Sequence, residues 1–466
     1  MKNLITKSNM KYIFLSTLMT LLVACEPTDM SENDEPLLLE GARLVTGNGG
    51  VIENGALLVD GGRIIAIGDR GSIESPPNVS VINFGGKTII PALIDAHAHL
   101  GYEGYGSWGA TNYSRENLID NLERYAYYGF SAVFSAGSDP DDLALALQRD
   151  QEAGIIDGAR FLFAAGMAPP GQGPNNQFLT HALAVEAETG MTILRGIASV
   201  EAGRAAVRDV ATKGITVVKI WVDDRGGSQE KLQPEVYRAI IDEANSSGID
   251  VYVHQQTAAD MPDLLAAGVT GFLHGRIESG MDDALIAEVK RSNAFIVPNL
   301  GLGELRRERI GDDSFLAESV PSVVMERLKD TFDARSGVNT DFGETERILQ
   351  DGFARLINVG VDIILGTDAG AVPDHYFGYA GHRELEIFVR LGMTPMQAII
   401  AATSKPAELL GLSDIGTLAV GKSADFIVLD ENPLDDIRNT QTISKVYLRG
   451  AEIDRTALRQ EWGSSN

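Results

Sequence analysis

The sequence has 466 residues, of which 44% are hydrophobic and 22% are charged, a balance typical of a globular protein. This length suits a barrel-sized domain accompanied by a smaller one. The formal net charge of -26 at pH 7 argues against a nucleic-acid-binding protein and against adhesion to anionic lipid. The charge favours solubility and identifies no substrate.

The first 24 residues have the features of a signal peptide rather than of a folded segment. Three lysines form a basic start, and residues 12–24 are an apolar run that is too short for a comfortable membrane span. The run ends immediately before Cys25, the only cysteine, and this junction resembles the lipobox of bacterial lipoproteins. The resemblance implies cleavage of residues 1–24 and attachment of lipid to Cys25. An ordinary secretory signal followed by an unrelated cysteine is the alternative.

Residues 25–36 are acidic and lack apolar periodicity, so we expect a flexible tether. A single cysteine allows no intrachain disulfide. Together these segments predict an exported protein that a lipid on Cys25 anchors to a bacterial membrane, on the periplasmic or cell-surface side. We expect no other contact with the membrane.

Two β-rich segments lie at opposite ends of the remaining chain, at 37–88 and 412–466. Both contain short apolar or alternating runs separated by glycine-containing turns, which is typical of strands. Two separate β flaps would leave more unpaired strand edges than one shared sheet. We therefore expect a single small β-sandwich domain that is built from both chain ends. The strand patterns cover residues 42–46, 55–59, 63–68, 81–84, 425–430 and 445–449.

The middle segment, residues 89–411, alternates strand and helix patterns, which indicates parallel βα units. Eight such units form a closed barrel, so the expected fold class is α/β with a (β/α)8 TIM-like barrel. The long, charged connection at 300–360 is expected to carry two helices and to form a lid or a pocket wall. Helices are expected over residues 115–128, 200–213, 234–247 and 282–292. The strand candidates end near His99, Ala136, Gly166, Val222, His254, His274, Asn299 and Asp368.

The first barrel strand ends in two histidines, His97 and His99. Residues two positions apart in a strand point to the same face, so both imidazoles project the same way. Two converging imidazoles are a first pair of ligands for a divalent metal. The chain has seven histidines, which makes a chance His-x-His at a strand end rare. The alternative is a strand that ends in two structural histidines.

Four further barrel strands carry an ionisable residue within or at the end of an apolar run. Lys219 lies among apolar neighbours, where a buried ammonium needs a partner or a changed protonation state. His254, His274 and Asp368 end three other strands. Each alone could be a structural polar residue. Together they reach the same rim of the barrel, at the strand ends where such barrels carry their chemistry.

These residues resemble the pattern of the amidohydrolase superfamily, and the resemblance covers roughly residues 37–453. It includes the approach at 89–95, the segment at 394–410 and the tail at 416–426. The nearest groups are the imidazolonepropionase-like and Xaa-Pro-dipeptidase-like amidohydrolases. Two departures from the pattern are Ala92, where glycine is usual, and the two glutamines after His254, where dipeptidase-like members often have an aromatic or basic residue. The second departure concerns peptide specificity rather than metal binding.

The resemblance implies a site for two divalent metal ions. Lys219 would bridge them after reaction with CO2 to a carbamate, because an ammonium group cannot ligate a cation. Zinc is the expected metal for histidine-rich ligation, and manganese, cobalt or iron fit the same donors. A site that holds only the first ion is the alternative. The ligands would be His97, His99 and Asp368 for the first ion, and His254 and His274 for the second.

The resemblance also implies a metal-dependent hydrolase that cleaves an amide C–N bond through a hydroxide shared by the two metals, with Asp368 moving a proton to the leaving amine. The substrate would be a small molecule or a dipeptide-like compound. The alternatives are an Xaa-Pro or Xaa-Arg dipeptidase or carboxypeptidase, a cyclic amide or lactone hydrolase, and a non-catalytic binding lipoprotein. No Gly-x-Ser-x-Gly elbow lies beside a suitable triad, which argues against a serine hydrolase.

Five side chains are candidates for substrate contacts. Tyr102 and Trp108, on the glycine-rich loop after the first barrel strand, would form an aromatic pocket or pack against the long connection. Arg225 would meet a substrate carboxylate or pair with a neighbouring aspartate. Tyr252 would lie beneath the metals or in the barrel core, and His382 would close over the site or begin a helix. By analogy with other such barrels, we also expect a homo-oligomer.

Overall fold

The computed structural model describes residues 35–275, 281–305, 307–335 and 343–464. The predicted signal peptide, the anchor at Cys25 and most of the predicted tether lie outside these residues. Among the residues that are described, no helix is long and apolar enough to cross a membrane.

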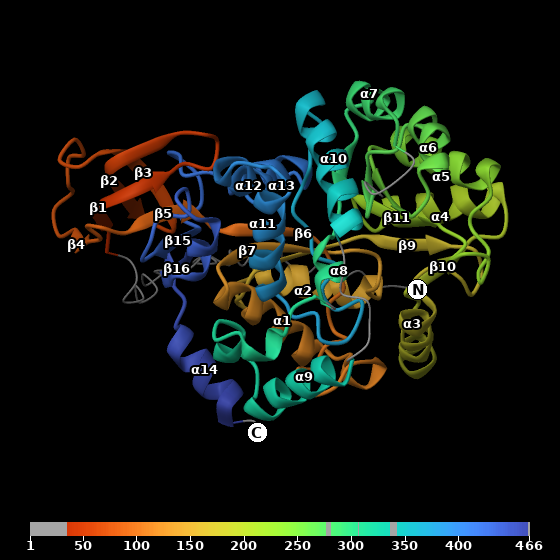
Figure 1. Ribbon diagram of the computed structural model, residues 1–466, viewed down its shortest axis with the longest axis horizontal. Helices are drawn as coiled ribbons and strands as arrows, with labels where there is room; N and C mark the ends of the chain where they lie inside the picture. Colours follow the sequence, from red (N-terminus) through yellow and green to blue (C-terminus); the bar gives the residue numbers. More distant parts are fainter. Residues whose placement is uncertain (1–34, 276–280, 306, 336–342, 465–466) are drawn as a thin grey trace, which may run out of the picture. The chain divides into compact units, whose positions relative to one another are not determined.

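The two ends of the chain share one eight-stranded sheet, which Figure 1 shows with red and orange N-terminal strands beside blue C-terminal ones. This sheet confirms that a separate β domain is assembled from both ends. Its strands are β1 (Leu37–Val45), β2 (Val51–Asp60), β3 (Arg63–Asp69), β4 (Ser80–Asn83), β5 (Thr88–Pro91), β15 (Phe426–Leu429), β16 (Ile443–Leu448) and β17 (Ala451–Glu452).

Strand β5 joins the two halves of this sheet. It runs parallel to β1 on one side and antiparallel to β15 on the other, with Ile90 opposite Ile427. Leu44, Ile89 and Phe426 are fully buried in the core of the domain. The sequence pattern assigned residue 89 onward to the barrel, whereas the structure places β5 in the end domain, because both of its edges are paired there.

A (β/α)8 barrel occupies the middle of the chain, as the alternating pattern predicted. Its third position is split between two short strands, β8 and β9. Strand β8 pairs with β7, the second barrel strand, and β9 pairs with β11, the fourth. A short extra strand, β10 (Leu194–Gly196), adds to the edge of β9. The barrel strands are β6 (Leu93–Ala98), β7 (Phe130–Ser135), β8 (Arg160–Phe163), β9 (Ala165–Ala168), β11 (Val217–Val222), β12 (Asp250–Gln255), β13 (Gly271–Leu273) and β14 (Phe295–Val297).

The eighth barrel position is filled by residues 361–369, here called the closing segment, which form isolated bridges instead of a regular strand. One parallel bridge joins the segment to β14 and another joins it to the end of β6, so the barrel closes. A Cβ on Gly366 would lie 2.4 Å from Val297 Cγ1 and 2.9 Å from His97 Cβ, so only glycine allows this close approach. Asp368 then adopts a positive φ of 61°, which ends the extended run.

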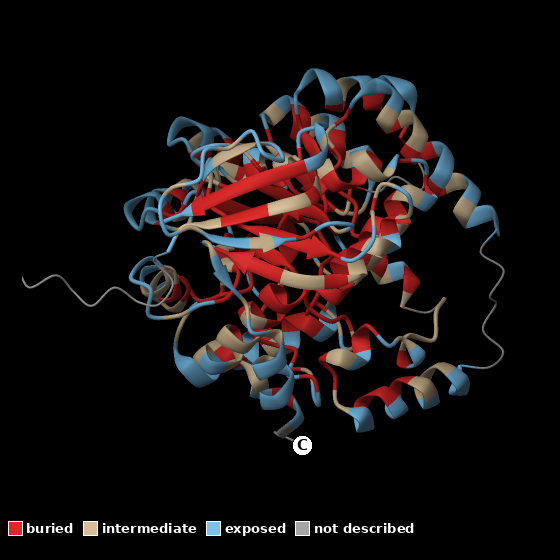
Figure 2. Cartoon of the chain, turned by 90° about the vertical axis from the view of Figure 1, so that its left-hand side faces the viewer, coloured by how far each residue is buried: buried red, intermediate tan, exposed pale blue. Residues whose placement is uncertain are grey.

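Helices cover the barrel, and in Figure 2 buried residues concentrate in the strands while the outward sides of the helices are exposed. The four predicted helices are found within one residue of both expected ends. Ser114, Ser199 and Asp282 explain three of these starts, because each side chain accepts a backbone N–H of the first turn. The helices are α1 (Arg115–Tyr127), α2 (Asp141–Glu152), α3 (Asn176–Thr189), α4 (Val200–Thr212), α5 (Pro234–Ser246), α6 (Met261–Ala267), α7 (Asp283–Arg291), α8 (Gly301–Glu304), α9 (Ser322–Ala334), α10 (Gly343–Val359), α11 (Tyr379–Arg390), α12 (Pro395–Ala401), α13 (Ser404–Leu409) and α14 (Arg455–Ser464).

Candidate metal centre and cavity

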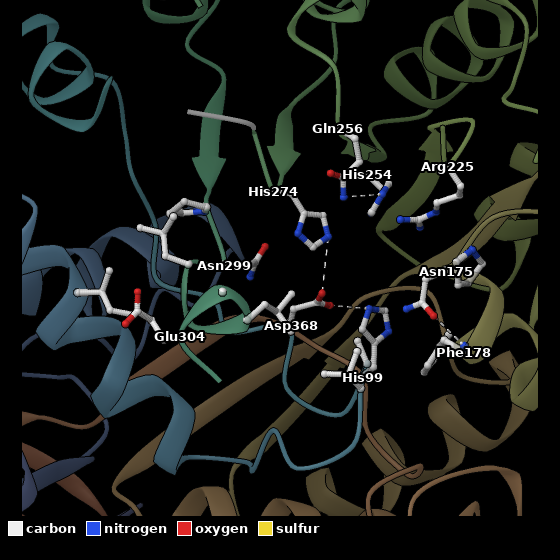
Figure 3. Close-up of a pocket in the computed structure, with 18 of the residues that line it drawn as sticks. His99, Asn175, Phe178, Arg225, His254, Gln256, His274, Asn299, Glu304 and Asp368 are labelled. Carbon is white, nitrogen blue, oxygen red and sulfur yellow. Dashed lines mark hydrogen bonds and ion pairs between the residues drawn. The ribbon is translucent and has the colours of Figure 1, made fainter. Parts of the chain in front are cut away.

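Five of the six predicted metal-ligating side chains lie together at the rim formed by the strand ends. His97 Nε2 and His99 Nε2 lie 3.2 and 3.1 Å from Asp368 Oδ1. His274 Nε2 lies 3.7 Å from Asp368 Oδ2, and Lys219 Nζ lies 3.4 Å from His97 Nε2. Figure 3 shows Asp368 between His99 and His274. This group combines imidazole nitrogens with a carboxylate.

His254 belongs to the same group through its ring contact with His274, with centroids 4.5 Å apart. Its Nε2, however, lies 3.0 Å from Asp223 Oδ2, so in this structure it faces Asp223 and not Asp368. Asp223 directly follows β11 and is buried. The sequence interpretation treated Asp223 only as a neighbour of Arg225. Its position at a strand end was the signal that could have identified it.

The Nδ1 atoms of His97 and His99 have partners that follow other barrel strands. His97 Nδ1 lies 2.9 Å from Asn299 Oδ1, and His99 Nδ1 lies 2.9 Å from Ser138 Oγ. A histidine that ligates through Nε2 carries its proton on Nδ1 and donates it to such an acceptor. Ser138 was not predicted from the sequence and Asn299 was predicted only as a strand end, although both follow barrel strands.

Asp95 fixes the relative position of β6 and the closing segment. Its carboxylate accepts hydrogen bonds from Tyr125 Oη at 2.7 Å and Thr367 Oγ1 at 2.6 Å. It also accepts the backbone N–H groups of His97 and Thr367, at 3.1 and 3.0 Å. Burial raises the pKa of Asp95 to about 6, although these hydrogen bonds oppose the rise. Asp95, two residues before His97, was not singled out from the sequence.

The protonation states in this group suit metal binding. Burial lowers the pKa of each of the four histidines, so the imidazoles are neutral and offer a lone pair. Burial also lowers the pKa of Lys219 to about 7. For Asp368, burial acts to raise the pKa, but His274, His99 and Lys219 in their protonated forms outweigh it and hold the pKa below its usual range.

The contacts around Asp368 provide a direct test of whether a cation fits. With the protons on Nδ1, where they can be donated to Asn299 Oδ1 and Ser138 Oγ, the Nε2 lone pairs of His97 and His99 face Asp368 Oδ1. That oxygen is buried and makes no hydrogen bond to any described residue. Acceptors held this close repel one another unless a cation lies between them. The residues present therefore fit a divalent metal ion.

A cavity of about 530 Å³ opens over these residues, a size that suits a small-molecule ligand. His99, His254, His274, Asn299 and Asp368 line its floor. One wall is polar, and Figure 3 shows it with Arg225, Asn175 and Gln256. The opposite wall is mainly apolar and includes Leu300, Leu302, Leu349 and Ile387, from the connection at 300–360 and from α11.

Arg225 is the one predicted substrate contact that lines the described cavity. Its Nη1 lies 3.0 Å from Asp223 Oδ2, and its Nη2 donates to Gly173 O at 3.1 Å. The guanidinium side chain is only 16% exposed. Arg225 thus pairs with a neighbouring aspartate, which is one of the two alternatives drawn from the sequence, and it also borders the cavity.

The other four predicted substrate contacts lie outside the cavity lining, and each has a structural setting of its own. Tyr102 packs against Phe178 behind His99, with ring centroids 4.6 Å apart. Trp108 Nε1 donates to Gly370 O at 2.8 Å, which fixes the loop after the closing segment. Their aromatic rings therefore support the rim and do not form its surface.

Tyr252 and His382 are buried at a distance from the cavity surface. Tyr252 packs between Phe134 and Phe295 in the barrel interior, with centroids 5.3 and 4.9 Å away. His382, near the start of α11, has Nε2 at 2.8 Å from Tyr128 O and Nδ1 at 3.0 Å from Thr440 Oγ1. The structure thus places Tyr252 in the core and gives His382 the structural role at a helix start.

Residues 88–453 match the sequence model of the amidohydrolase family, so the chain belongs to this family. The family assignment confirms the class predicted from the strand-end residues, a hydrolase that acts on carbon–nitrogen bonds. It also agrees with a metal-dependent site, for which His97, His99 and Asp368 provide a compact set of ligand atoms, all within 4.8 Å of one another.

Individual relatives share most of the chain. Imidazolonepropionase from Geobacillus kaustophilus is 25% identical over 407 residues, which cover 82% of this chain and 85% of the relative. The structure of a candidate prolidase from Bifidobacterium longum is 28% identical, with a TM-score of 0.68, and the match covers 92% of this chain and 99% of that one. An Xaa-Pro dipeptidase with bound methionine shares the fold at 24% identity and a TM-score of 0.68, covering 90% and 99% of the two chains.

Proposed function

We propose that this protein hydrolyses an amide bond in a small molecule or a dipeptide-like substrate and that it uses two divalent metal ions. The observation that carries the proposal is the cluster of facing acceptors at Asp368, directly beneath a cavity of small-molecule size. Cations between its members would stabilise such a cluster. The relatives named imidazolonepropionase and Xaa-Pro dipeptidase support the amide as the bond that is cleaved.

The chain offers ligands for both ions. His97, His99 and Asp368 would hold the first ion, while His254 and His274 would hold the second after the His254 ring turns away from Asp223. Bound ions of this kind, with zinc as the first choice, supply an activated water at neutral pH and polarise a carbonyl oxygen.

Lys219 would bridge the two ions as a carbamate. The carbamate forms when the neutral amine attacks CO2, which makes an N–C bond and releases a proton. Burial lowers the pKa of Lys219 to about 7, so a large fraction of the amine is neutral at physiological pH. Its Nζ already lies beside His97 Nε2, at 3.4 Å.

Asp368 would move the proton during the reaction. Its Oδ1 is buried, has no hydrogen-bond partner among the described residues and belongs to a carboxylate that its neighbours keep ionised. It would accept a proton from the attacking water and deliver it to the leaving nitrogen. Arg225 on the polar wall would receive a substrate carboxylate, which is the feature that favours an N-acyl amino acid or a dipeptide among the amide substrates.

Metal analysis combined with an amide screen tests this proposal. We expect about two equivalents of a transition metal in the purified protein and hydrolysis of at least one among N-acyl amino acids, dipeptides ending in proline or arginine, and cyclic amides. Lys219→Ala should lose metal and activity, with partial rescue by short carboxylates, whereas the surface control Lys213→Ala should retain both. Absence of bound metal after incubation with zinc or manganese would refute the proposal. Metal binding without any hydrolysis would favour a binding protein.

A further inference from the structure

Asn299 occupies a position between the metal centre and the cavity that no predicted role explains. It follows the end of β14, separated from it by one proline, and is 4% exposed. Its Oδ1 lies 2.9 Å from His97 Nδ1, and the residue lines the cavity. Its Nδ2 is buried and has no hydrogen-bond partner among the described residues. A buried amide nitrogen without an acceptor is costly and calls for an explanation.

The orientation of this amide follows from the chemistry of His97. When His97 ligates a metal ion through Nε2, its proton resides on Nδ1 and is donated to an acceptor. The carbonyl oxygen of Asn299 is that acceptor. The other end of the amide, Nδ2 with its two N–H donors, is therefore on the side away from His97, beside the cavity. Figure 3 shows Asn299 at the same site as His274 and Asp368.

Asn299 has the same left-handed backbone conformation as two of the predicted ligands. Asn299 has a φ of 52°, compared with 78° for His274 and 61° for Asp368. These left-handed conformations each end a barrel strand, and such backbone strain is concentrated at functional sites. The buried carboxylate of Glu384 accepts the next two backbone N–H groups, from Leu300 at 2.8 Å and Gly301 at 2.7 Å. His97 therefore holds the amide oxygen of Asn299, and Glu384 holds the backbone that follows it.

We propose that Asn299 is a catalytic residue with two functions. Its Oδ1 holds His97 with Nε2 toward Asp368, and its Nδ2 donates a hydrogen bond to the carbonyl oxygen of the substrate amide. As water attacks the carbonyl carbon, electrons of the C=O bond shift to that oxygen, so the hydrogen bond is stronger in the transition state than in the ground state. This inference rests on the proposed amide hydrolysis.

Two substitutions separate the two functions. Asn299→Asp keeps an oxygen for His97 and removes the N–H donor, and aspartate tolerates the left-handed backbone as asparagine does. Asn299→Gly removes both functions, adds no charge and tolerates the same backbone. The matched control is Asn293→Asp, because Asn293 lies just before β14, is exposed and has a φ of 54°.

The expected pattern differs between metal binding and turnover. Asn299→Asp should keep its metal content within about twofold, whereas Asn299→Gly should lose metal at limiting concentrations. Both should lower kcat on a neutral amide by about 100-fold, with KM within about threefold, as on removal of one oxyanion donor. With metal in excess, Asn299→Gly should bind methylphosphonate, a tetrahedral oxyanion, at least about tenfold more weakly. Asn293→Asp should match the parent protein in all three measurements.

Two results would overturn the assignment. One is an Asn299→Asp protein with the parent kcat, and the other is unchanged methylphosphonate affinity in metal-saturated Asn299→Gly. The binding experiment also separates this inference from the proposed function. If no protein hydrolyses any amide but methylphosphonate binding still depends on Asn299, the amide reaction is refuted and the donor role of Asn299 is retained.

Discussion

Two buried carboxylates, Asp95 and Asp368, lie at successive levels of the same barrel and differ in how their oxygens are used. Asp95, below the rim, accepts four hydrogen bonds from donors on α1, β6 and the closing segment. Asp368, at the rim, has a buried oxygen with no hydrogen-bond partner among the described residues and two imidazole lone pairs facing it. Burial is common to both. They differ in their partners: the oxygens of Asp95 are satisfied by hydrogen bonds, whereas Asp368 Oδ1 has none within the described part of the chain and is available to a cation.

The largest effect should follow from substitution at the rim. Asp368→Asn should lower kcat by about 10³-fold, because the proton acceptor is lost. The metal-free protein should unfold within about 1 kcal/mol of the parent, since the new amide can donate to a histidine Nε2. Steady-state kinetics and urea unfolding of the metal-free protein measure the two quantities. If metal-free Asp368→Asn lost more than about 2 kcal/mol of stability, Asp368 would have a structural role like that of Asp95.

Substitution of Asp95, below the rim, should lower stability more than Asp368→Asn does and turnover less. Asp95→Asn should destabilise the protein by about 2–3 kcal/mol, because the amide nitrogen is brought against donors and leaves some of them unsatisfied. At saturating metal, kcat should fall by about 10- to 100-fold at most, through displacement of His97. Urea unfolding and kinetics on the same preparation check this. Full stability of Asp95→Asn would show that its four hydrogen bonds do not hold the closing segment in place.

His382 extends the comparison to a histidine whose nitrogens are both satisfied. Burial lowers its pKa to about 4, compared with 6.5 in the unfolded chain, so the unfolded state binds more protons between these values. Its contribution to stability is present above pH 6.5 and is lost as pH falls to 4, by at most about 3 kcal/mol. In His382→Gln this pH dependence should be weaker and kcat at pH 8 unchanged. A large loss of kcat with retained stability would instead place His382 in the site.

The smallest effect is expected from Trp108, which supports the rim without touching the cavity. Trp108→Phe removes the hydrogen bond to Gly370 O and keeps most of the aromatic packing. We expect a loss of about 1 kcal/mol in stability and less than about a fivefold change in kcat. Thermal unfolding and kinetics measure these values. A change in KM larger than tenfold would indicate that the indole contacts substrate.

Local signals in the sequence were sufficient to predict most of the fold. Three helix starts were predicted to within one residue, and the structure shows that local sequence determines them, because Ser114, Ser199 and Asp282 cap first turns that are their neighbours in sequence. The irregular closing segment was not visible, because its shape depends on how closely Gly366 approaches Val297 and His97. For the same reason, the assignment of β5 to the end domain required knowledge of its pairing with β15.

In the candidate site, too, the features that could not be predicted depend on contacts between residues far apart in the sequence. The strand-end positions of His97, His99, His274 and Asp368 were enough to predict that they share one rim, since parallel strands end at one edge. Lys219 was predicted from its place within an apolar strand. The orientation of His254 toward Asp223, and the partners Ser138 and Asn299, depend on rotamers and on contacts between distant strands. The aromatic loop after β6 was ambiguous because an exposed tyrosine and a buried one follow the same sequence pattern.

The junction between β5 and β6 has a consequence for dividing this protein into parts. Only Ala92 separates the two strands, and its N–H donates to Asp425 O at 3.0 Å, in the C-terminal half of the end domain. The strand that carries the His-x-His pair is thus directly continuous with a sheet that needs both chain ends. A fragment of residues 89–411 would keep every predicted ligand but lose this attachment. The barrel and the end domain are therefore one unit for truncation, domain exchange or circular permutation, and a boundary chosen by sequence motifs alone would divide it at its most sensitive point.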